Sequence, residues 1–368
     1  MSLLILSPST CVRALSVNSI CTHCADVCPT GAISITGRLP SINQVQCVGC
    51  AGCLAVCPTE ALGLDDFSPT DFFFTFASDE DNVISCQKNV PCIAALSHEQ
   101  LISFALMKQG VVLDTGHCLG CDIGVSILAT LANTLENTNY LLEAIESEFR
   151  VECSDIGYNT LGEGEAVVER RDFFKTFHLR GLGKIRGDFE KEIQKTTDEF
   201  VEHSTDSSHT KELRSKKITD RRKLFYTALK RTEVPENFHV VEGSKIPFTS
   251  QKLMDESACT ACEMCYRICP TGALTSDMRN SKIDFDPFLC VKCHLCHDVC
   301  EPDAITLSTS YNLQEWYQPK VQNLVTYRVR RCDECDALFS SSIGEKICRR
   351  CRLEEEEALE LWGLKDRI

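Results

Sequence analysis

The fold is decided by residues 259–300, which read Cys259-x2-Cys262-x2-Cys265-x3-Cys269-Pro270 and then Cys290-x2-Cys293-x2-Cys296-x3-Cys300. Eight thiolates at this spacing have few uses other than holding two 4Fe–4S clusters. In two-cluster proteins with this spacing, the fourth cysteine of each run ligates the cluster of the other run. The sequence therefore predicts one cluster on Cys259, Cys262, Cys265 and Cys300, and a neighbouring cluster on Cys269, Cys290, Cys293 and Cys296.

A second group of cysteines, near the N-terminus, reads Cys21-x2-Cys24-x3-Cys28-Pro29 and then Cys47-x2-Cys50-x2-Cys53-x3-Cys57-Pro58. By the same rule, one 4Fe–4S cluster is expected on Cys28, Cys47, Cys50 and Cys53. The other run departs from the pattern, because Asn18 stands where its first cysteine should be. If residues 12–20 loop out, Cys11 replaces it, and the second cluster is expected on Cys11, Cys21, Cys24 and Cys57.

The gap at Asn18 leaves two alternatives open. The module can hold a three-iron cluster, or a four-iron cluster with one open iron, while Cys11 stays a buried thiol that binds nothing. An open iron could bind a substrate, which would make the protein an enzyme.

A short signature recurs four times: a cysteine, a turn that contains proline, and the start of a strand. Its copies begin at Cys28, Cys57, Cys269 and Cys300. The copies come in two pairs, so we expect two ferredoxin-like modules, at residues 1–66 and 246–310. Neither module is large enough for an ordinary apolar core, so cluster binding and folding are expected to be one event.

Residues 70–160 carry a third set of cysteines in a region where strand-like and helix-like segments alternate. We expect strands at 72–76, 82–85 and 110–114, and helices at 91–108 and 123–148. This order predicts a small α/β domain with parallel strands and a four-cysteine site made of Cys86, Cys92, Cys118 and Cys121. Four thiolates suit either a 2Fe–2S cluster or zinc, and beside so many iron sites we favour 2Fe–2S.

Residues 161–245 contain no cysteine and mix both signs of charge. Apolar residues recur there at helical intervals, among them Phe173, Phe177, Leu224, Phe225 and Leu229. We therefore expect a charged helical spacer made of exposed helices. The alternative is an arm that docks a partner protein.

The C-terminal segment, residues 311–368, carries Cys332-x2-Cys335-x12-Cys348-x2-Cys351 and an acidic terminal helix at 353–362. Two cysteine pairs joined by a short connection are typical of a zinc ribbon, in which one tetrahedral ion has four protein ligands and no open position. We expect structural zinc here, with a redox-active iron as the alternative. Of the 25 cysteines, Cys153 is then left over, and we expect an inert buried thiol.

Composition excludes several classes of protein. Thiolate ligands need a reducing compartment, and the cysteine spacing is not that of a disulfide framework, so a cytoplasmic location is expected. No run of about 18 apolar residues is present, so no membrane span is expected. The formal net charge of −15 disfavours nucleic acid as a partner. No P-loop and no correctly spaced dinucleotide fingerprint is found, so no nucleotide cofactor is expected. No set of catalytic residues can be picked out.

The chain resembles the polyferredoxin-type electron-transfer subunits of hydrogenase, formate dehydrogenase and formate hydrogenlyase systems. The resemblance rests on the two cysteine-rich modules, which cover about a third of the chain. A ferredoxin module followed by the four cysteines of residues 332–351 is similar in layout to the ferredoxin-like subunit of formate hydrogenlyase. The segment from Cys86 to Cys121 resembles the small iron–sulfur delta subunit of methyl-viologen-reducing hydrogenases. These resemblances imply a partner that is the catalytic subunit of a formate dehydrogenase or hydrogenase.

Together these features predict an α+β multidomain protein with four 4Fe–4S clusters, one 2Fe–2S cluster (or zinc) and one zinc site. Its expected role is to relay single electrons between a cytoplasmic redox enzyme and another carrier, without catalysis of its own. The middle domain would then bridge two docking ends. The alternatives are an accessory or maturation iron–sulfur protein and an enzyme with an open iron near Asn18.

Overall fold

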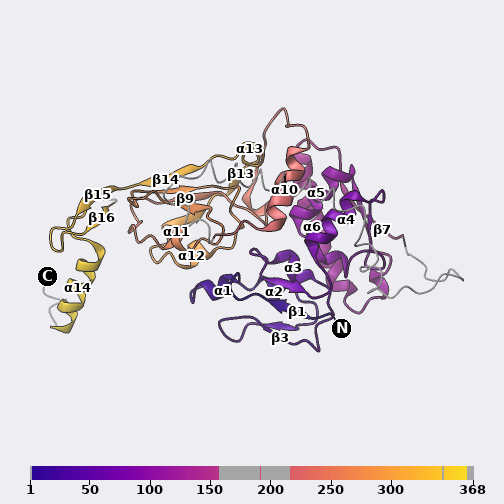
Figure 1. The fold of residues 1–368 in the computed structure, drawn as a ribbon, viewed down its shortest axis with the longest axis horizontal. Helices are drawn as coiled ribbons and strands as arrows, with labels where there is room; N and C mark the ends of the chain where they lie inside the picture. Colours follow the sequence, from indigo (N-terminus) through magenta and orange to yellow (C-terminus); the bar gives the residue numbers. More distant parts are fainter. Residues whose placement is uncertain (1, 157–190, 192–215, 342–343, 363–368) are drawn as a thin grey trace, which may run out of the picture.

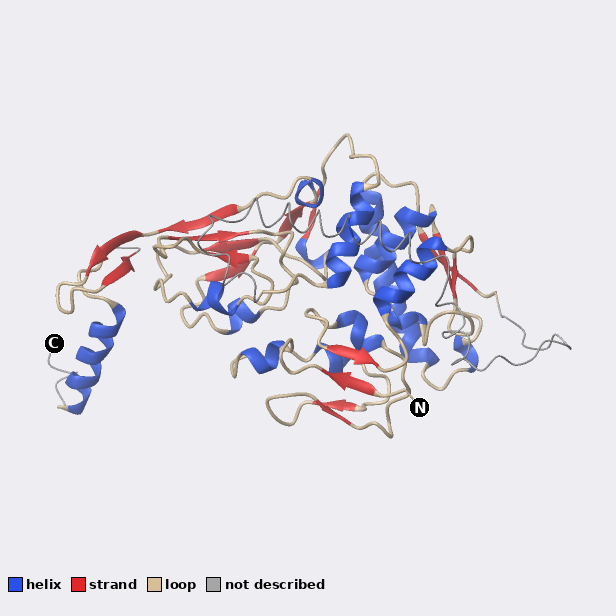
Figure 2. Ribbon diagram, viewed as in Figure 1, coloured by secondary structure: helices blue, strands red, loops and turns tan. Residues whose placement is uncertain are grey.

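The computed structural model describes residues 2–156, 191, 216–341 and 344–362. Small antiparallel sheets and short helices surround the N-terminal and C-terminal cysteine runs, and longer helices form from the stretch of chain between those runs (Figures 1 and 2). The chain is thus a mixed helix-and-sheet structure, as expected from the sequence. A hairpin and a helix at the C-terminal end project away from the rest, on the side opposite to the α/β region (Figure 1).

The N-terminal module is built from two short strand pairs and three helices. In order they are β1 (Leu4–Leu6), α1 (Val12–Leu15), α2 (His23–Asp26), β2 (Ile33–Ser34), β3 (Ser41–Ile42), α3 (Gly52–Val56) and β4 (Leu62–Leu64). β1 pairs antiparallel with β4, and β2 pairs antiparallel with β3. The first and last strands therefore close the module, with a hairpin between the two cysteine runs.

The C-terminal module repeats this layout. It contains β9 (Lys252–Met254), α11 (Met264–Ile268), β10 (Leu274–Thr275), β11 (Lys282–Phe285), α12 (Leu295–Asp298) and β12 (Ile305–Leu307). β9 pairs with β12, and β10 pairs with β11, again antiparallel. β14 (Gln322–Thr326) adds a third strand beside β11, so the sheet of this module continues past residue 310, where the sequence suggested its end.

Further short elements surround the C-terminal module. β8 (Val240–Glu242) and the 3-10 turn η3 (Gly243–Lys245) precede it, and β13 (Ser310–Asn312) and α13 (Gln314–Tyr317) follow it. β8 and β13 pair antiparallel. The segments just before and just after the module are therefore held together beside it.

The region between the modules contains a sheet of three parallel strands in the order β5 (Val83–Ile84), β6 (Val111–Asp114) and β7 (Val151–Ser154). Its connections hold the 3-10 turns η1 (Ile93–Ala95) and η2 (Cys118–Gly120) and the helices α5 (His98–Lys108) and α6 (Gly124–Ala144). The predicted parallel pairing is confirmed. β5, β6, α5 and α6 all lie within the ranges expected for them.

The prediction of a strand at 72–76 is wrong, because these residues belong to α4 (Pro69–Ser78). Ser68 caps this helix by accepting a hydrogen bond from the backbone N–H of Asp71 (3.2 Å), and Pro69 stands in the first turn. Three phenylalanine rings of α4 surround Phe104 of α5, with centroids 4.9, 5.0 and 5.6 Å away. Because the buried phenylalanines 72–74 and 76 are nearly consecutive, the apolar run looks like a buried strand, although Asp71, Thr75 and Ser78 form a polar face at helical spacing.

Helix α10 (Asp220–Lys230) overturns the expectation that the spacer consists of exposed helices. Leu224, Phe225 and Leu229 are 2%, 0% and 1% exposed. α10 packs along α5, and Phe225 meets Trp316 of α13 with ring centroids 5.0 Å apart. The helix is therefore part of the central core. The other helices expected for the spacer, including those around Phe173 and Phe177, lie outside the described residues.

Two neighbouring arginines at the start of α10 tie the modules together. Arg222 Nε donates to Glu99 Oε1 (2.6 Å), and Arg221 Nε lies 3.1 Å from Glu99 Oε2. The other donors of Arg221 reach carbonyls of the N-terminal module, at Leu54, Ala55 and Cys57. The other donors of Arg222 reach carbonyls in and beside the C-terminal module, at Phe248, Phe288 and Cys290.

The two modules are also linked without these arginines. The carboxylate of Glu60, in the N-terminal module, caps α10 by accepting from the backbone N–H groups of Asp220 (2.8 Å) and Arg221 (2.9 Å). The backbone N–H of Ile20 donates to Asp298 Oδ2 of α12 (3.2 Å). The modules thus contact each other directly, whereas the sequence suggested that the middle domain bridges them.

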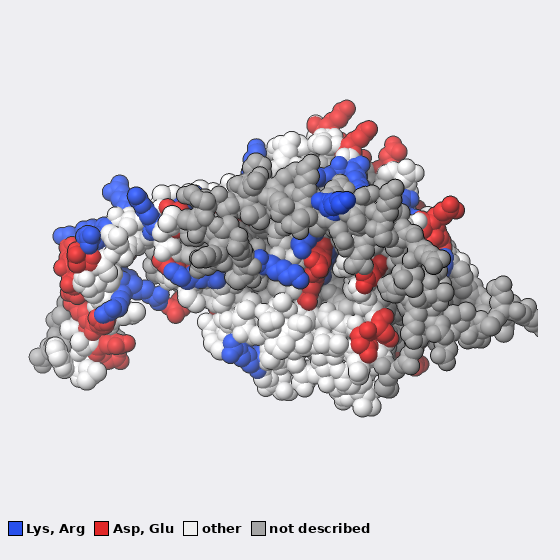
Figure 3. All heavy atoms as spheres, in the orientation of Figure 1, with Lys and Arg blue, Asp and Glu red and all other residues white. Residues whose placement is uncertain are grey.

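The C-terminal hairpin consists of β15 (Arg328–Arg331) and β16 (Leu338–Ser341), and α14 (Arg349–Leu361) follows it. The expected acidic helix is present and begins at Arg349 rather than Leu353. Arginines of β15 and glutamates of α14 bring both signs of charge to this end of the molecule (Figure 3). In the part of the chain that the structure describes, no helix combines the length and apolar character needed to cross a membrane.

The buried carboxylate yields a first prediction. Glu99→Gln keeps the shape of the side chain but leaves two buried guanidinium groups without a counter-charge. We expect the free energy of unfolding to fall by about 3–5 kcal/mol. Anaerobic denaturant titration of the holoprotein, followed by visible absorbance, measures this. Glu136→Gln is the matched control, because Glu136 pairs with Lys245 (2.6 Å) on the surface and its loss should leave the midpoint near wild type. Equal midpoints for the two variants would contradict a central role for Glu99.

Candidate metal centres

In the C-terminal module, one cavity is lined by all four cysteines expected to share a cluster: Cys269, Cys290, Cys293 and Cys296. Two of their sulfurs have hydroxyl groups beside them. Ser250 Oγ lies 3.4 Å from Cys290 Sγ, and Thr271 Oγ1 lies 3.8 Å from Cys269 Sγ. A hydroxyl can donate to a thiolate and stabilise its charge. The four cysteines therefore line one cavity in which nearby hydroxyl groups can stabilise negative charge on the sulfurs.

Three basic side chains, those of Lys252, His294 and His297, lie near these four cysteines. Burial by itself lowers the pKa of Lys252, but the thiolates of Cys290, Cys296 and Cys293 outweigh it and raise that pKa. Burial, and then the charge of Lys252, lower the pKa of both His294 and His297 to about 4. Near neutral pH the lysine therefore carries the positive charge and the histidines carry none. The sequence reasoning missed Lys252.

The second set of the C-terminal module is also brought together. Burial raises the pKa of Cys259, and the nearby thiols of Cys262 and Cys300 raise it further. Burial likewise raises the pKa of Cys265, and nearby thiols, including Cys259 and Cys262, raise it further. Cys300, from the second run, thus lies among the cysteines of the first run. Tyr327, beyond the module, places its hydroxyl 2.9 Å from Cys259 Sγ.

The complete run of the N-terminal module has a matching arrangement. Burial raises the pKa of Cys53, and the thiols that add to it include Cys50, Cys47 and Cys28. Thr30 Oγ1 lies 3.7 Å from Cys28 Sγ, as Thr271 lies beside Cys269 in the other module. Cys28 therefore joins the second cysteine run, as the crossed pattern of ligands requires.

The incomplete run of the N-terminal module meets Cys11. A second cavity is lined by Cys11, Cys21, Cys24 and Cys57. Cys11 is 7% exposed and Cys57 is 9% exposed, and the backbone N–H of Ala61 donates to Cys57 Sγ (3.2 Å). Asn18 does not line this cavity. The fourth thiol that the run lacks in sequence is thus supplied in space by Cys11.

Strand register gives an independent reason for the position of Cys11. Leu6 of β1 faces Leu62 of β4, and Met254 of β9 faces Ile305 of β12, so these two pairs are equivalent. Cys11 follows Leu6 by five residues, and Cys259 follows Met254 by five residues. Cys11 is therefore the counterpart of Cys259. The residues after it, which include α1, are an insertion in the N-terminal module.

The backbone of the three complete runs is shaped for an anion. In each run, the residues just before and just after the second cysteine have positive φ: Gly49 and Ala51, Ala261 and Glu263, Lys292 and His294. Alternating left-handed and right-handed residues turn successive N–H groups into one concavity, a backbone nest that binds anions. A 4Fe–4S cluster with four thiolates is such an anion, so the donor set fits the predicted group. The run from Cys21 to Cys24 lacks these residues, in keeping with the insertion before it.

The third cysteine set lies where the parallel strands end. Cys86 follows β5, Cys118 opens the turn after β6, and Cys92 and Cys121 lie in the same loops. Burial, together with the nearby thiols of Cys86 and Cys121, raises the pKa of Cys118 to about 11. Burial and nearby thiols, among them Cys86 and Cys118, together raise the pKa of Cys92 to about 12. The four cysteines are thus neighbours, as expected for one site.

Asp114 organises the loops of this site, and no pattern in the sequence points to it. Asp114 is the last residue of β6 and is 1% exposed. Its carboxylate accepts from Ser85 Oγ (2.8 Å) and from the backbone N–H groups of Gly116 (2.9 Å) and Ile156 (3.2 Å). It therefore connects the ends of all three strands. Gly124 is equally constrained, because a Cβ there would lie 1.7 Å from the carbonyl oxygen of Cys118.

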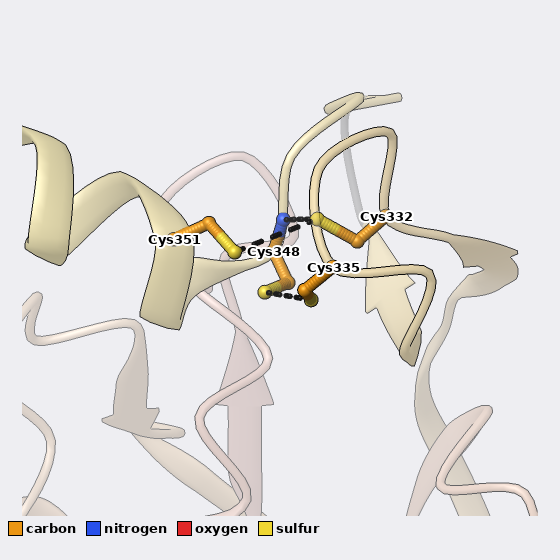
Figure 4. Close-up of side chains that lie close together, drawn as sticks. All are labelled: Cys332, Cys335, Cys348 and Cys351. Atoms are coloured by element: carbon orange, nitrogen blue, oxygen red, sulfur yellow. Dashed lines mark hydrogen bonds between the residues drawn. The ribbon is translucent and has the colours of Figure 1, made fainter.

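Cys332 and Cys335 of the C-terminal hairpin and Cys348 and Cys351 at the start of α14, together called the hairpin set, point toward one another (Figure 4). The sulfurs of Cys332 and Cys351 are 3.9 Å apart, and those of Cys335 and Cys348 are 3.7 Å apart. Four sulfurs bound tetrahedrally at about 2.3 Å would be ~3.8 Å apart. The backbone N–H of Cys348 also donates to Cys332 Sγ (3.2 Å). This geometry suits a single tetrahedral ion.

The α/β cysteine set and the two ferredoxin-type modules lie next to one another along the molecule. Cys50 is the first thiol, after burial, that raises the pKa of Cys92, so the α/β site borders the N-terminal module. A Cβ on Gly52 would lie 3.6 Å from Ala94 Cβ and 3.9 Å from Cys50 Sγ, which shows how closely the two regions approach. On its other side, the N-terminal module meets α12 through the contact between Ile20 and Asp298. Cys153, by contrast, is exposed rather than buried as expected.

Comparison with known proteins agrees with this geometry. Residues 19–61 and 251–301 each match a family model described as a 4Fe-4S dicluster domain. A stretch of 44 residues, 12% of the chain, is 43% identical to a subunit of an ion-translocating oxidoreductase complex from Methanosarcina acetivorans and spans 17% of that protein. The chain therefore carries two ferredoxin-type 4Fe–4S domains, which are characteristic of iron–sulfur electron-transfer proteins. Cys11 lies outside both matched segments.

The position of Cys11 yields a second prediction. Cys11→Ser should lower the iron content and convert one EPR signal to that of a three-iron cluster, because one thiolate of the set is lost. Cys153→Ser is the matched control and should leave both unchanged. Iron analysis and EPR of anaerobically purified protein measure the result. An unaltered spectrum in Cys11→Ser would show that Cys11 is not a ligand.

Proposed function

We propose that this protein relays single electrons, through a series of iron–sulfur centres, between a redox enzyme and a second electron carrier. The observation that carries the proposal is the sequence of neighbouring cysteine sets, in which Cys92 lies beside Cys50 and Ile20 contacts Asp298 of the other module. A protein that merely stored clusters would not need them in contact. We infer a cytoplasmic location from the reduced thiols that these sites require.

The chain contributes the holding and tuning of the centres. When bound, iron–sulfur clusters supply reversible one-electron chemistry. The cysteine sulfurs hold them, the backbone nests around Gly49 and Lys292 direct N–H groups at them, and hydroxyls such as those of Thr30 and Thr271 lie beside the sulfurs. These residues do not provide a nucleophile with a base beside it. The proposed role is therefore electron transfer without catalysis by this chain.

We assign a 2Fe–2S cluster to Cys86, Cys92, Cys118 and Cys121. In the described residues, the hairpin set is the one group of three or more Cys, His or acidic residues whose ligand atoms all lie within 4.8 Å of one another. The α/β set is wider than that. A wider set suits a cluster with two metal ions better than a single zinc ion.

We assign structural zinc to Cys332, Cys335, Cys348 and Cys351. Support comes from sulfur pairs 3.7 and 3.9 Å apart and from the closed shape of the site, where all four positions are taken by protein. The site also stands apart from the other cysteine sets, on the projecting hairpin (Figure 1). A metal that stabilises a small hairpin does not need to be close to the electron path.

We infer that the partner is a catalytic subunit of the hydrogenase or formate dehydrogenase type. The layout of the modules and of the C-terminal hairpin supports this, while the short match to a subunit of an ion-translocating oxidoreductase complex supports a redox partner without indicating its type. An enzyme acting at an open iron near Asn18 is the rival. The cavity lined by Cys11, Cys21, Cys24 and Cys57 speaks against it, because it offers four thiols.

The proposed function can be tested with purified components. The holoprotein is mixed anaerobically with a hydrogenase or a formate dehydrogenase, hydrogen or formate is added, and visible absorbance is followed. We expect bleaching with one of the two enzymes and none without enzyme, and the reduced protein should then reduce a low-potential viologen. If dithionite bleaches the protein but neither enzyme does, the inferred partner is wrong.

Metal content is the third prediction. Anaerobically purified protein should contain about 18 iron atoms and one zinc per chain, from four cubes, one binuclear cluster and one hairpin site. Cys335→Ser should remove the zinc and leave iron unchanged, because Cys335 belongs to the hairpin set alone. Element analysis by mass spectrometry measures both metals. Colourless protein, or ferredoxin modules loaded with zinc, would refute the electron-transfer proposal.

A further inference from the structure

Lys252 is a buried cation inside a cysteine cavity. It is the first residue of β9 and is 3% exposed. It lines the cavity that Cys269, Cys290, Cys293 and Cys296 also line. Its Nζ lies 2.8 Å from His297 Nε2 and 5.9 Å from the ring centroid of Phe285. The ammonium group therefore points into the proposed cluster site rather than to solvent.

No carboxylate neutralises this lysine. Among the residues that the structure describes, Lys252 forms no ion pair with Asp or Glu, and its hydrogen bond to His297 is to a ring nitrogen. Burying an unpaired ammonium group is costly. The cost is offset if the cavity itself holds an anion. A 4Fe–4S cluster with four thiolates is an anion, and reduction makes it more negative by one charge.

The N-terminal module provides a reference within the same chain. Lys252 faces Leu307 in the β9–β12 pair, two positions before Met254 faces Ile305. Leu4 faces Leu64 in the equivalent β1–β4 pair, also two positions before Leu6 faces Leu62. Leu4 is therefore the counterpart of Lys252, and it is equally buried at 3%. The same place in the fold holds a cation in one module and an alkyl group in the other.

The difference extends around the cavity. Counting from the aligned cysteines, Lys292 corresponds to Gly49, His294 to Ala51 and His297 to Leu54. Lys292 and Gly49 both have positive φ, as do His294 and Ala51, so the backbones match while the side chains differ. Lys292 donates to the carbonyls of Gly243 (2.9 Å) and Ile246 (2.6 Å). Lys252 and His294 thus bring nitrogen-bearing side chains to the cavity of one cysteine set, whereas the equivalent positions of the other module hold Leu4 and Ala51.

We propose that Lys252 raises the reduction potential of the cluster held by Cys269, Cys290, Cys293 and Cys296 above that of its counterpart held by Cys28, Cys47, Cys50 and Cys53. A positive charge in a buried site stabilises the more negative, reduced form. The inference rests on the proposed electron-transfer function and adds to it a direction, because the C-terminal module becomes the better electron acceptor. Lys252 acts through the cluster environment and is a tuning residue, not a catalytic one.

The test is a potentiometric titration of the full-length holoprotein followed by EPR, with iron content measured for every variant. Lys252→Leu gives the site the residue of its counterpart, and Lys252→Met keeps the unbranched stem. Both should shift one 4Fe–4S cluster to a more negative potential and leave the other clusters in place. Lys252→Arg keeps the charge and should stay near wild type. Lys245→Met removes the same charge from an exposed position and should cause no shift.

Each outcome decides the proposal. Full iron content with unchanged potentials in Lys252→Leu and Lys252→Met would overturn it. Loss of one cluster in both variants would make Lys252 a folding residue and would overturn it too. Wild-type protein without reducible clusters would instead refute the proposed function itself. A reciprocal variant adds an independent check: Leu4→Lys should raise the potential of one cluster of the N-terminal module if it folds with full iron.

Discussion

The carboxylate of Glu99 holds the parts of this protein in their relative positions. It is 2% exposed and lies between two guanidinium groups whose other donors end on the backbones of two different modules. Charges buried in this way need compensating partners. Here carbonyls of both cysteine-rich modules accept from the terminal nitrogens of the two arginines, so α5, α10 and both modules must be in place together. Modules too small for a large core of their own thereby share one, which runs from Phe104 to Trp316.

Within each module, the cysteine loops depend on an unfavourable backbone. Non-glycine residues at positive φ, such as Ala51 and Glu263, cost roughly 1–2 kcal/mol each. Positive φ recurs at the same two positions of three cysteine runs, and only Gly49 of the six residues is a glycine, which argues for one shared cause. That cause is the need to turn several N–H groups toward the same anion. This backbone cost is an argument for the expected coupling of folding to cluster binding, because the bound anion would offset it. The fourth run, from Cys11 to Cys24, lacks these positive-φ residues and has α1 inserted after Cys11.

The sequence predicted features that depend on residues close together in the chain, and it failed for features that depend on residues far apart. Cysteine spacing was sufficient to group the cavity-lining cysteines, and apolar runs located β5 and β6, because both signals lie within a few residues. The phenylalanine run at 72–76 was misread, because its residues favour strands while the deciding cap is Ser68. The burial of α10 could not be predicted at all. Arg222 has the pattern of a solvated residue, and its partner Glu99 lies 123 positions away in the chain. No local pattern encodes such a pair.

Two modules with the same strand register and the same backbone around the second cysteine run would ordinarily give the clusters of those runs similar environments. If all the clusters of a relay had the same reduction potential, electrons would have no preferred direction along it. The side chains around the second cysteine run break this symmetry, with Lys252 and His297 in one module and Leu4 and Leu54 in the other. The backbone of both runs stays the same, so the change affects charge and not ligand geometry. Under the proposal made for Lys252, different side chains at positions that touch the cavity, but supply no ligand, give two similar backbones different reduction potentials and the chain a direction of electron flow.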